Sequence, residues 1–183
     1  MQVADKNRDA KAIALLAVVC AVLQLALAPN LGLGNGRANV ALVFCALVAL
    51  RVGGRTGVVA GFLSGLFFDL ATTGPVGLMA FCLSLVGFVL GREERDRMVE
   101  GVGGLTVAFA ACALGVSLVY HLAMLLVGQA DSLLDVIVFR TLPTALLTLA
   151  FFVPLAWLFS RTRPASSGFG SARRGSHLSK RGL

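Results

Sequence analysis

Four polar side chains interrupt the apolar stretches of this sequence and have the chemistry to form a site: Gln24, Asp69, His121 and Arg140. Ionisable groups inside a lipid bilayer are costly, so they usually face the protein interior, a partner or a ligand. At a rise of about 1.5 Å per residue, all four lie roughly 6–9 Å from the same end of their predicted helices. The sequence therefore predicts one intramembrane polar layer.

Three arrangements of this polar layer remain open. Asp69 and Arg140 can form an ion pair, with His121 or Gln24 as a hydrogen-bond neighbour. Asp69 can instead cap the next helix, whose start is marked by Gly74-Pro75, because acids and prolines favour helix starts. The layer can also bind a ligand or relay a proton. Position along a helix does not give the rotation about its axis, so all three stay as hypotheses.

Catalytic motifs are absent from the sequence. It contains no G-x-x-x-x-G-K-[ST], no H-E-x-x-H, no G-x-S-x-G and no pair of acids within one apolar stretch. The cysteines lie singly in four different apolar stretches and form no C-x-x-C pair, which predicts packing rather than metal binding: Cys20, Cys45, Cys82 and Cys112. We therefore expect no enzyme activity, no metal, no cofactor and no nucleic-acid partner.

Composition sets the fold class. Of the 183 residues, 57% are hydrophobic and 14% are charged. In soluble domains about 45–50% of the residues are apolar and about 25% are charged. Because a membrane-spanning helix needs about 20 mostly apolar residues, we expect an all-α integral membrane protein with about six transmembrane helices. The apolar stretches are 12–28, 38–50, 57–72, 74–91, 101–127 and 134–160. They form one transmembrane domain, 12–160, between an N-terminal segment, 1–11, and a basic disordered tail, 161–183.

The basic residues predict the orientation. With six spans and a cytoplasmic N-terminus, 14 of the 16 Lys and Arg residues fall on the cytoplasmic side, as the positive-inside rule requires. The short second stretch, 38–50, is alternatively re-entrant, but that would place the basic loop 92–97 outside. Residues 1–28 are alternatively a cleaved signal peptide. We predict a multi-pass protein with both termini in the cytoplasm. The disordered basic tail serves this orientation alone, or alternatively contacts anionic lipid headgroups or a cytoplasmic partner.

Glycines recur every four residues in the third stretch, and the spacing repeats once in the fourth. Small residues at this spacing let two helix backbones approach closely inside a membrane. The pattern predicts either packing within the chain or an interface with another membrane protein. The glycines concerned are Gly53, Gly57, Gly61, Gly65, Gly87 and Gly91.

The third and fourth stretches together carry a family resemblance. The segment G-V-V-A-G-F-L-S-G-L-F-F-D-L at 57–70, the turn T-G-P-V-G-L-M-A at 73–80 and the L-V-G-F-V-L-G ending at 85–91 resemble the rod shape-determining protein MreD. The motif spans about 40 residues. The rest of the chain agrees in its hydropathy, its length and its basic termini.

This resemblance implies a non-enzymatic scaffold or regulator in the plasma membrane of a bacterium, acting in cell shape and peptidoglycan synthesis. The implied partners are an MreC-like protein, a RodA-like glycosyltransferase, a class B penicillin-binding protein and, directly or through another subunit, the actin-like MreB. The implied fold is similar to that of the substrate-binding subunits of vitamin importers. A substrate-binding importer subunit is therefore the alternative function. Asp69 and the glycines carry over as core positions of the family.

Overall fold

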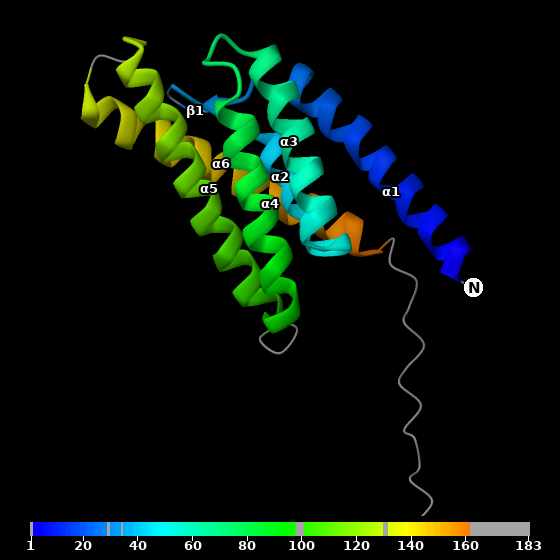
Figure 1. The fold of residues 1–183 in the computed structure, drawn as a ribbon. Helices are drawn as coiled ribbons and strands as arrows, with labels where there is room; N and C mark the ends of the chain where they lie inside the picture. Colours follow the sequence, from blue (N-terminus) through cyan, green and yellow to red (C-terminus); the bar gives the residue numbers. More distant parts are fainter. Residues whose placement is uncertain (1, 29, 34, 98–100, 130–131, 162–183) are drawn as a thin grey trace, which may run out of the picture.

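The computed structural model describes residues 2–28, 30–33, 35–97, 101–129 and 132–161. The described residues are almost entirely helical and include one short β-hairpin (Figure 1). In chain order the elements are helix α1 (Gln2–Val22), π-helix η1 (Leu23–Leu27), strands β1 (Gly32–Leu33) and β2 (Gly36–Arg37), helices α2 (Val40–Val52), α3 (Gly54–Ala71), α4 (Leu78–Arg97) and α5 (Gly101–Leu126), π-helix η2 (Asp135–Thr141) and helix α6 (Leu142–Arg161). The predicted basic tail lies outside the described residues apart from Arg161.

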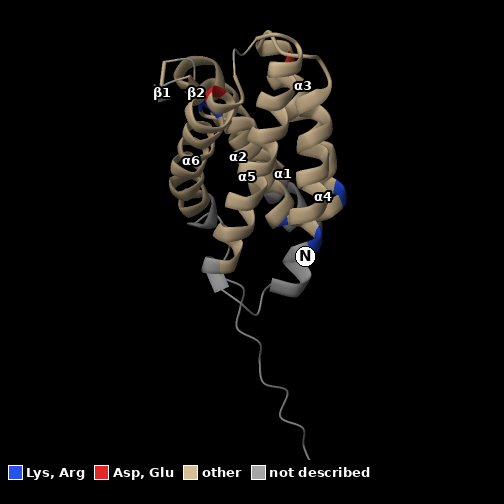
Figure 2. Ribbon diagram, turned by 90° about the vertical axis from the view of Figure 1, so that its left-hand side faces the viewer, with Lys and Arg blue, Asp and Glu red and all other residues tan. Residues whose placement is uncertain are grey.

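Successive helices alternate in direction, so the bundle has two distinct ends. The β1–β2 hairpin, the α3–α4 turn and the connection from α5 to η2 lie at one end, here called the hairpin end (Figure 1). The N-terminus, the α2–α3 junction and the end of α6 lie toward the other, here called the N-terminal end. Figure 2 shows Lys and Arg gathered at the N-terminal end, where Arg51, Arg55 and Arg92 lie, and beside β2 at the hairpin end.

Three helical stretches among the described residues are long and apolar enough to cross a membrane: Ala10–Leu27, Gly104–Leu126 and Asp135–Leu158. The apolar helices Val40–Val52 and Leu78–Arg92 are shorter. The membrane-protein class is therefore supported, while the count of six spans stays a prediction.

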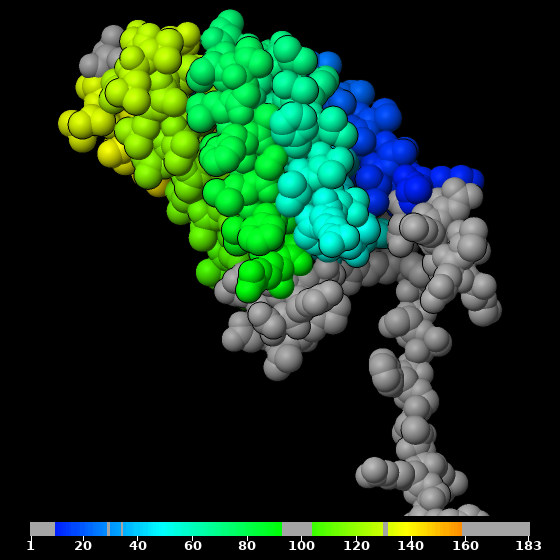
Figure 3. All heavy atoms as spheres, in the orientation of Figure 1, coloured from blue at the N-terminus to red at the C-terminus, as the bar shows by residue number. Residues whose placement is uncertain are grey.

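The short second apolar stretch forms the centre of the bundle. Ten of the 13 residues of α2 are buried. On the side of the molecule drawn in Figure 3, residues of α1, α3, α4 and α5 make up the surface and cover α2. A helix enclosed by protein does not have to match the thickness of the hydrocarbon core with its own length. The shortness of α2 thus reflects its place in the core, and α2 runs from the hairpin end to the N-terminal end, where α3 turns back.

Glycines bring α3 and α4 into backbone contact. A Cβ atom added at Gly65 would lie 2.5 Å from the Cα of Ala80, and one at Gly61 would collide with the carbonyl of Leu83. From the α4 side of the same contact, Gly87 lies directly against the backbone of Gly57 in α3. The glycine pattern therefore serves packing within the chain, and α4 covers the face that was the alternative candidate for a partner interface.

Two of the predicted glycines have different surroundings. Gly91 packs against Gly54, which the four-residue spacing did not include. Gly53 has a φ of 96° and no atom within 4 Å of an added Cβ. It ends α2 and begins α3, and a positive φ is a conformation that glycine adopts without steric cost. Gly53 therefore serves the turn between α2 and α3, and its backbone carbon would lie 3.0 Å from a Cβ added at Gly91.

Candidate functional site

The polar layer at the hairpin end

The structure places all four predicted polar residues toward the hairpin end. Gln24 lies in η1, Asp69 in the last turn of α3, His121 near the end of α5 and Arg140 in η2. His121 and Arg140 line a shared cavity, whereas Gln24 and Asp69 do not line it. The layer is therefore divided between two roles, which the hydrogen bonds identify.

Asp69 caps α4. Its carboxylate is 1% exposed and accepts hydrogen bonds from three backbone N–H groups: Gly77 at 2.8 Å, Met79 at 3.2 Å and Ala80 at 3.2 Å. The first N–H groups of a helix have no partner within it, and a carboxylate also interacts favourably with the positive end of the helix dipole. The capping hypothesis is confirmed and the predicted ion pair with Arg140 is wrong.

Gln24 has the same role at the start of α2. Its side-chain oxygen accepts the N–H groups of Val40 at 2.8 Å and Ala41 at 3.3 Å. The Asn39 side chain accepts the N–H of Leu42 at 3.0 Å. Two helices that begin inside the bundle thus have their free N–H groups satisfied by polar side chains of preceding segments, as an apolar environment demands.

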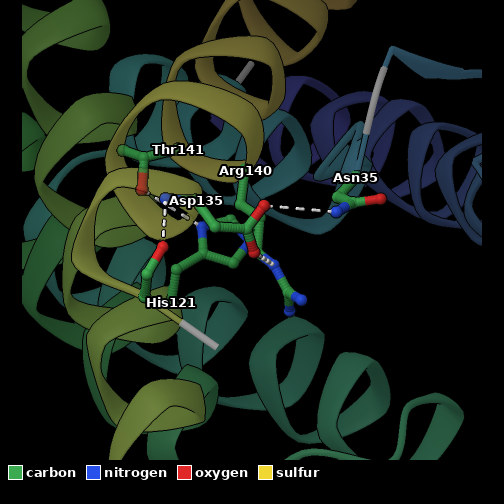
Figure 4. A network of polar contacts seen from close by, with 6 residues as sticks. Asn35, His121, Asp135, Arg140 and Thr141 are labelled. Atoms are coloured by element: carbon green, nitrogen blue, oxygen red, sulfur yellow. Dashed lines mark hydrogen bonds and ion pairs between the residues drawn. The ribbon is translucent and has the colours of Figure 1, made fainter. Parts of the chain in front are cut away.

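Arg140 pairs with an acid that the sequence analysis did not single out. Its Nε donates to Asp135 at 2.8 Å, and the other oxygen of Asp135 accepts from the Asn35 side chain at 3.3 Å (Figure 4). The two paired residues are five apart, a spacing that brings side chains together in a π-helix because its backbone bonds join residues i and i+5. A search for pairs three or four apart, as in an α-helix, misses them.

His121 lies beside this pair. Its Nδ1 is 3.4 Å from the hydroxyl of Thr141 (Figure 4), and its ring meets that of Tyr120 edge to face, with centroids 5.6 Å apart. Tyr120 makes a second edge-to-face contact with Phe68 at 5.7 Å. Among the described residues no group of three His, Cys, Asp or Glu side chains has a metal-binding arrangement.

How the hairpin is held

Alternate backbone N–H groups of the β-hairpin and of the residues after it donate hydrogen bonds to η2 and α6. Asn35 donates to the carbonyl of Phe139 at 3.2 Å, Arg37 to the hydroxyl of Thr144 at 3.1 Å, and Asn39 to the hydroxyl of Thr148 at 3.0 Å. Residues two apart face the same side of an extended segment. The hairpin therefore lies on the helix through one side of its backbone.

Proline and glycine make this close approach possible. Pro143 has no N–H, so the carbonyl four residues earlier, at Phe139, lacks its usual α-helical partner and is open to Asn35. A Cβ added at Gly36 would lie 2.8 Å from the Cβ of Pro143 and 2.9 Å from the carbonyl of Arg140. The freed carbonyl was predictable from the sequence, but the hairpin that uses it was not.

We expect Thr148→Val to lower the melting temperature of the protein purified in detergent. The substitution keeps the side-chain shape and leaves the buried N–H of Asn39 without an acceptor, which costs about 1–3 kcal/mol. Thr73→Val is the matched control, because Thr73 is exposed in the α3–α4 turn. Equal melting temperatures for the two variants would show that the bond between Asn39 and Thr148 contributes nothing.

Relation to known proteins

The fold and the site define a class: a helical membrane protein whose buried polar groups hold its own helices in place. Residues 10–162 of the chain match the family model described as rod shape-determining protein MreD. The match covers most of the 183 residues, so the chain belongs to the MreD family. No curated protein and no solved structure matches the chain.

Proposed function

We propose that this protein is a non-enzymatic membrane scaffold that regulates the cell-wall elongation machinery and through it cell shape. The family match over residues 10–162 carries this proposal. The proposed partners are an MreC-like protein, a RodA-like glycosyltransferase and a class B penicillin-binding protein, with the actin-like MreB bound directly or through another subunit. The comparisons offer no support for the alternative, an importer subunit.

The geometry of the polar layer supports a structural role. Asp69 and Gln24 are fully engaged as helix caps, and Arg140 is bound to Asp135. Groups occupied in this way hold helices at fixed positions. A scaffold needs such rigidity, because a surface presents a partner with constant geometry only if its helices do not shift.

The surface left for partners is apolar. Each long helix exposes large hydrophobic side chains, among them Leu15, Leu63, Phe81, Leu118 and Val153. Such side chains contact lipid or the helices of other membrane proteins. Because α4 covers the glycine face, we propose that partners contact these outward faces instead.

The proposed placement is a multi-pass protein in the plasma membrane with the N-terminal end of the bundle in the cytoplasm. Arg51, Arg55 and Arg92 lie at that end, and basic residues favour the cytoplasmic side. The hairpin end then faces outward. The basic segment 161–183 would follow α6 on the cytoplasmic side, where anionic lipid headgroups attract Lys and Arg.

Photo-crosslinking in the native membrane tests the scaffold. A photoreactive amino acid is introduced singly at Leu15, Leu63, Phe81, Leu118 and Val153, and the crosslinked proteins are identified by mass spectrometry. We expect an MreC-like protein or a wall synthase at adjacent positions on one face and lipid alone elsewhere. Capture of an energy-coupling ATPase complex, or of no shape-determining protein at any position of a correctly folded chain, would contradict the proposal.

A further inference from the structure

A cavity of about 570 Å³ lies at the hairpin end. The hairpin, the end of α3, α5 and η2 line this open cavity, with Met79 of α4 and Thr144 of α6. Its polar lining includes Asn35, Arg37, Tyr120, His121, Gln129 and Arg140. Small-molecule sites commonly measure about 300–1,000 Å³ and combine an apolar wall with a few convergent polar groups. Phe68, Met79 and Met124 supply the apolar wall here.

Two guanidinium groups line this hairpin-end cavity, and among the described residues that line it there is no carboxylate. Arg37 is exposed, and its side chain makes no hydrogen bond to another described residue. Arg140 uses Nε for Asp135, and its terminal amino groups point away from that carboxylate (Figure 4). An arginine has five N–H donors, so both side chains have donors that no hydrogen bond to another described residue uses.

Two described acids, Asp135 and Asp69, lie at the same end of the bundle as these cations. Both oxygens of Asp135 are engaged, one with Arg140 and one with Asn35. Both oxygens of Asp69 accept N–H groups of the α4 turn. Asp135 therefore offsets the charge of Arg140, whereas Arg37 has no ion pair with a described residue. The guanidinium N–H groups that the described fold does not use can still form charge-assisted hydrogen bonds.

We infer that this cavity binds a small ligand through a phosphate or carboxylate held by Arg37 and Arg140. Guanidinium groups match the geometry of these anions because two parallel N–H groups can donate to two oxygens. The bound anion can come from two sources, the headgroup of an anionic phospholipid or a free anion in the surrounding water. This inference does not depend on the scaffold role.

Thermal unfolding of the full-length chain in detergent tests the site. Inorganic phosphate is titrated at constant ionic strength, and phosphatidylglycerol is titrated against phosphatidylcholine in mixed micelles. A ligand that binds only the folded state raises the melting temperature in a saturable way. Stabilisation by phosphate alone identifies a free anion as the ligand, and stabilisation by phosphatidylglycerol over phosphatidylcholine identifies a lipid headgroup. Either result supports an anion site.

Three arginine variants test whether the anion binds at Arg37 and Arg140. We expect Arg37→Gln and Arg140→Gln each to weaken the apparent affinity about tenfold or more, the loss expected for a hydrogen bond to a charged group. Arg55→Gln is the matched control, because Arg55 is an exposed arginine at the opposite end of the bundle. Arg37 makes no side-chain bond within the described fold, so its variant remains informative if Arg140→Gln does not fold.

Two outcomes would overturn the inference. One is that neither phosphate nor phosphatidylglycerol raises the melting temperature of the unmodified chain. The other is that Arg37→Gln keeps the affinity of the unmodified chain, or that Arg55→Gln loses as much affinity as Arg37→Gln does.

Discussion

Asp69→Ala is expected to abolish or severely reduce the yield of folded protein. The substitution leaves three N–H groups at the start of α4 without their acceptor, at about 1–3 kcal/mol for each buried donor. Folded domains are stable by only about 5–15 kcal/mol in total. The measurement is the monodisperse fraction in size-exclusion chromatography, followed by the melting temperature of that fraction.

Two further variants distinguish capping from an ion pair. Asp69→Asn keeps an acceptor oxygen of the same shape and should fall between the alanine variant and the unmodified chain. Arg140→Gln should cost less than Asp69→Ala, because it removes one contact, that with Asp135, whereas Asp69→Ala removes the acceptor of three N–H groups. If Arg140→Gln were as damaging as Asp69→Ala, the assignment of Asp69 as a cap would be wrong.

The sequence predicted which residues occupy the polar layer, but it did not predict their partners. Depth follows from counting residues along a helix, so Gln24, Asp69, His121 and Arg140 were placed at the correct end. Partners depend on rotation and on local backbone form. The π-helix Asp135–Thr141 turned Arg140 toward Asp135, and no sequence pattern that we used indicates a π-helix.

Cap geometry was the more predictable part of the site. Asp69 precedes the start of α4 by nine residues, and the Gly-Pro turn between them marks a helix start. The hairpin was harder to predict, because its strands have two residues each and it is held by bonds to residues more than 100 positions away. Contacts over such a separation have no local signature in a single sequence.

The glycine spacing shows the same limit. It correctly indicated a close helix–helix contact, since only small residues allow backbones to meet. It could not identify the second helix, and both a helix of the same chain and a helix of a partner fit the pattern. The structure assigns the contact to α4, which follows α3 through a short turn.

Gly61→Ala is expected to destabilise the bundle although alanine favours helices. The added Cβ would collide with the Leu83 carbonyl and lie 2.9 Å from the Sγ of Cys45, so α3 must move away from both α4 and α2. Overpacking of this kind typically costs about 1–3 kcal/mol, which exceeds the gain in helix propensity of up to about 1 kcal/mol. Gly61→Leu adds three more carbon atoms at the same place and should prevent folding.

Gly115→Ala is the matched control for this prediction. Gly115 also lies within a helix, but a Cβ added there has no atom within 4 Å, so only the propensity gain applies and the melting temperature should stay equal or rise. A partner interface at the glycine stripe would give a different pattern, in which Gly61→Ala folds with an unchanged melting temperature and loses its crosslinks to other membrane proteins. Because α4 fills the space in front of Gly61, we expect the loss of stability to come first, in purified protein with no partner present.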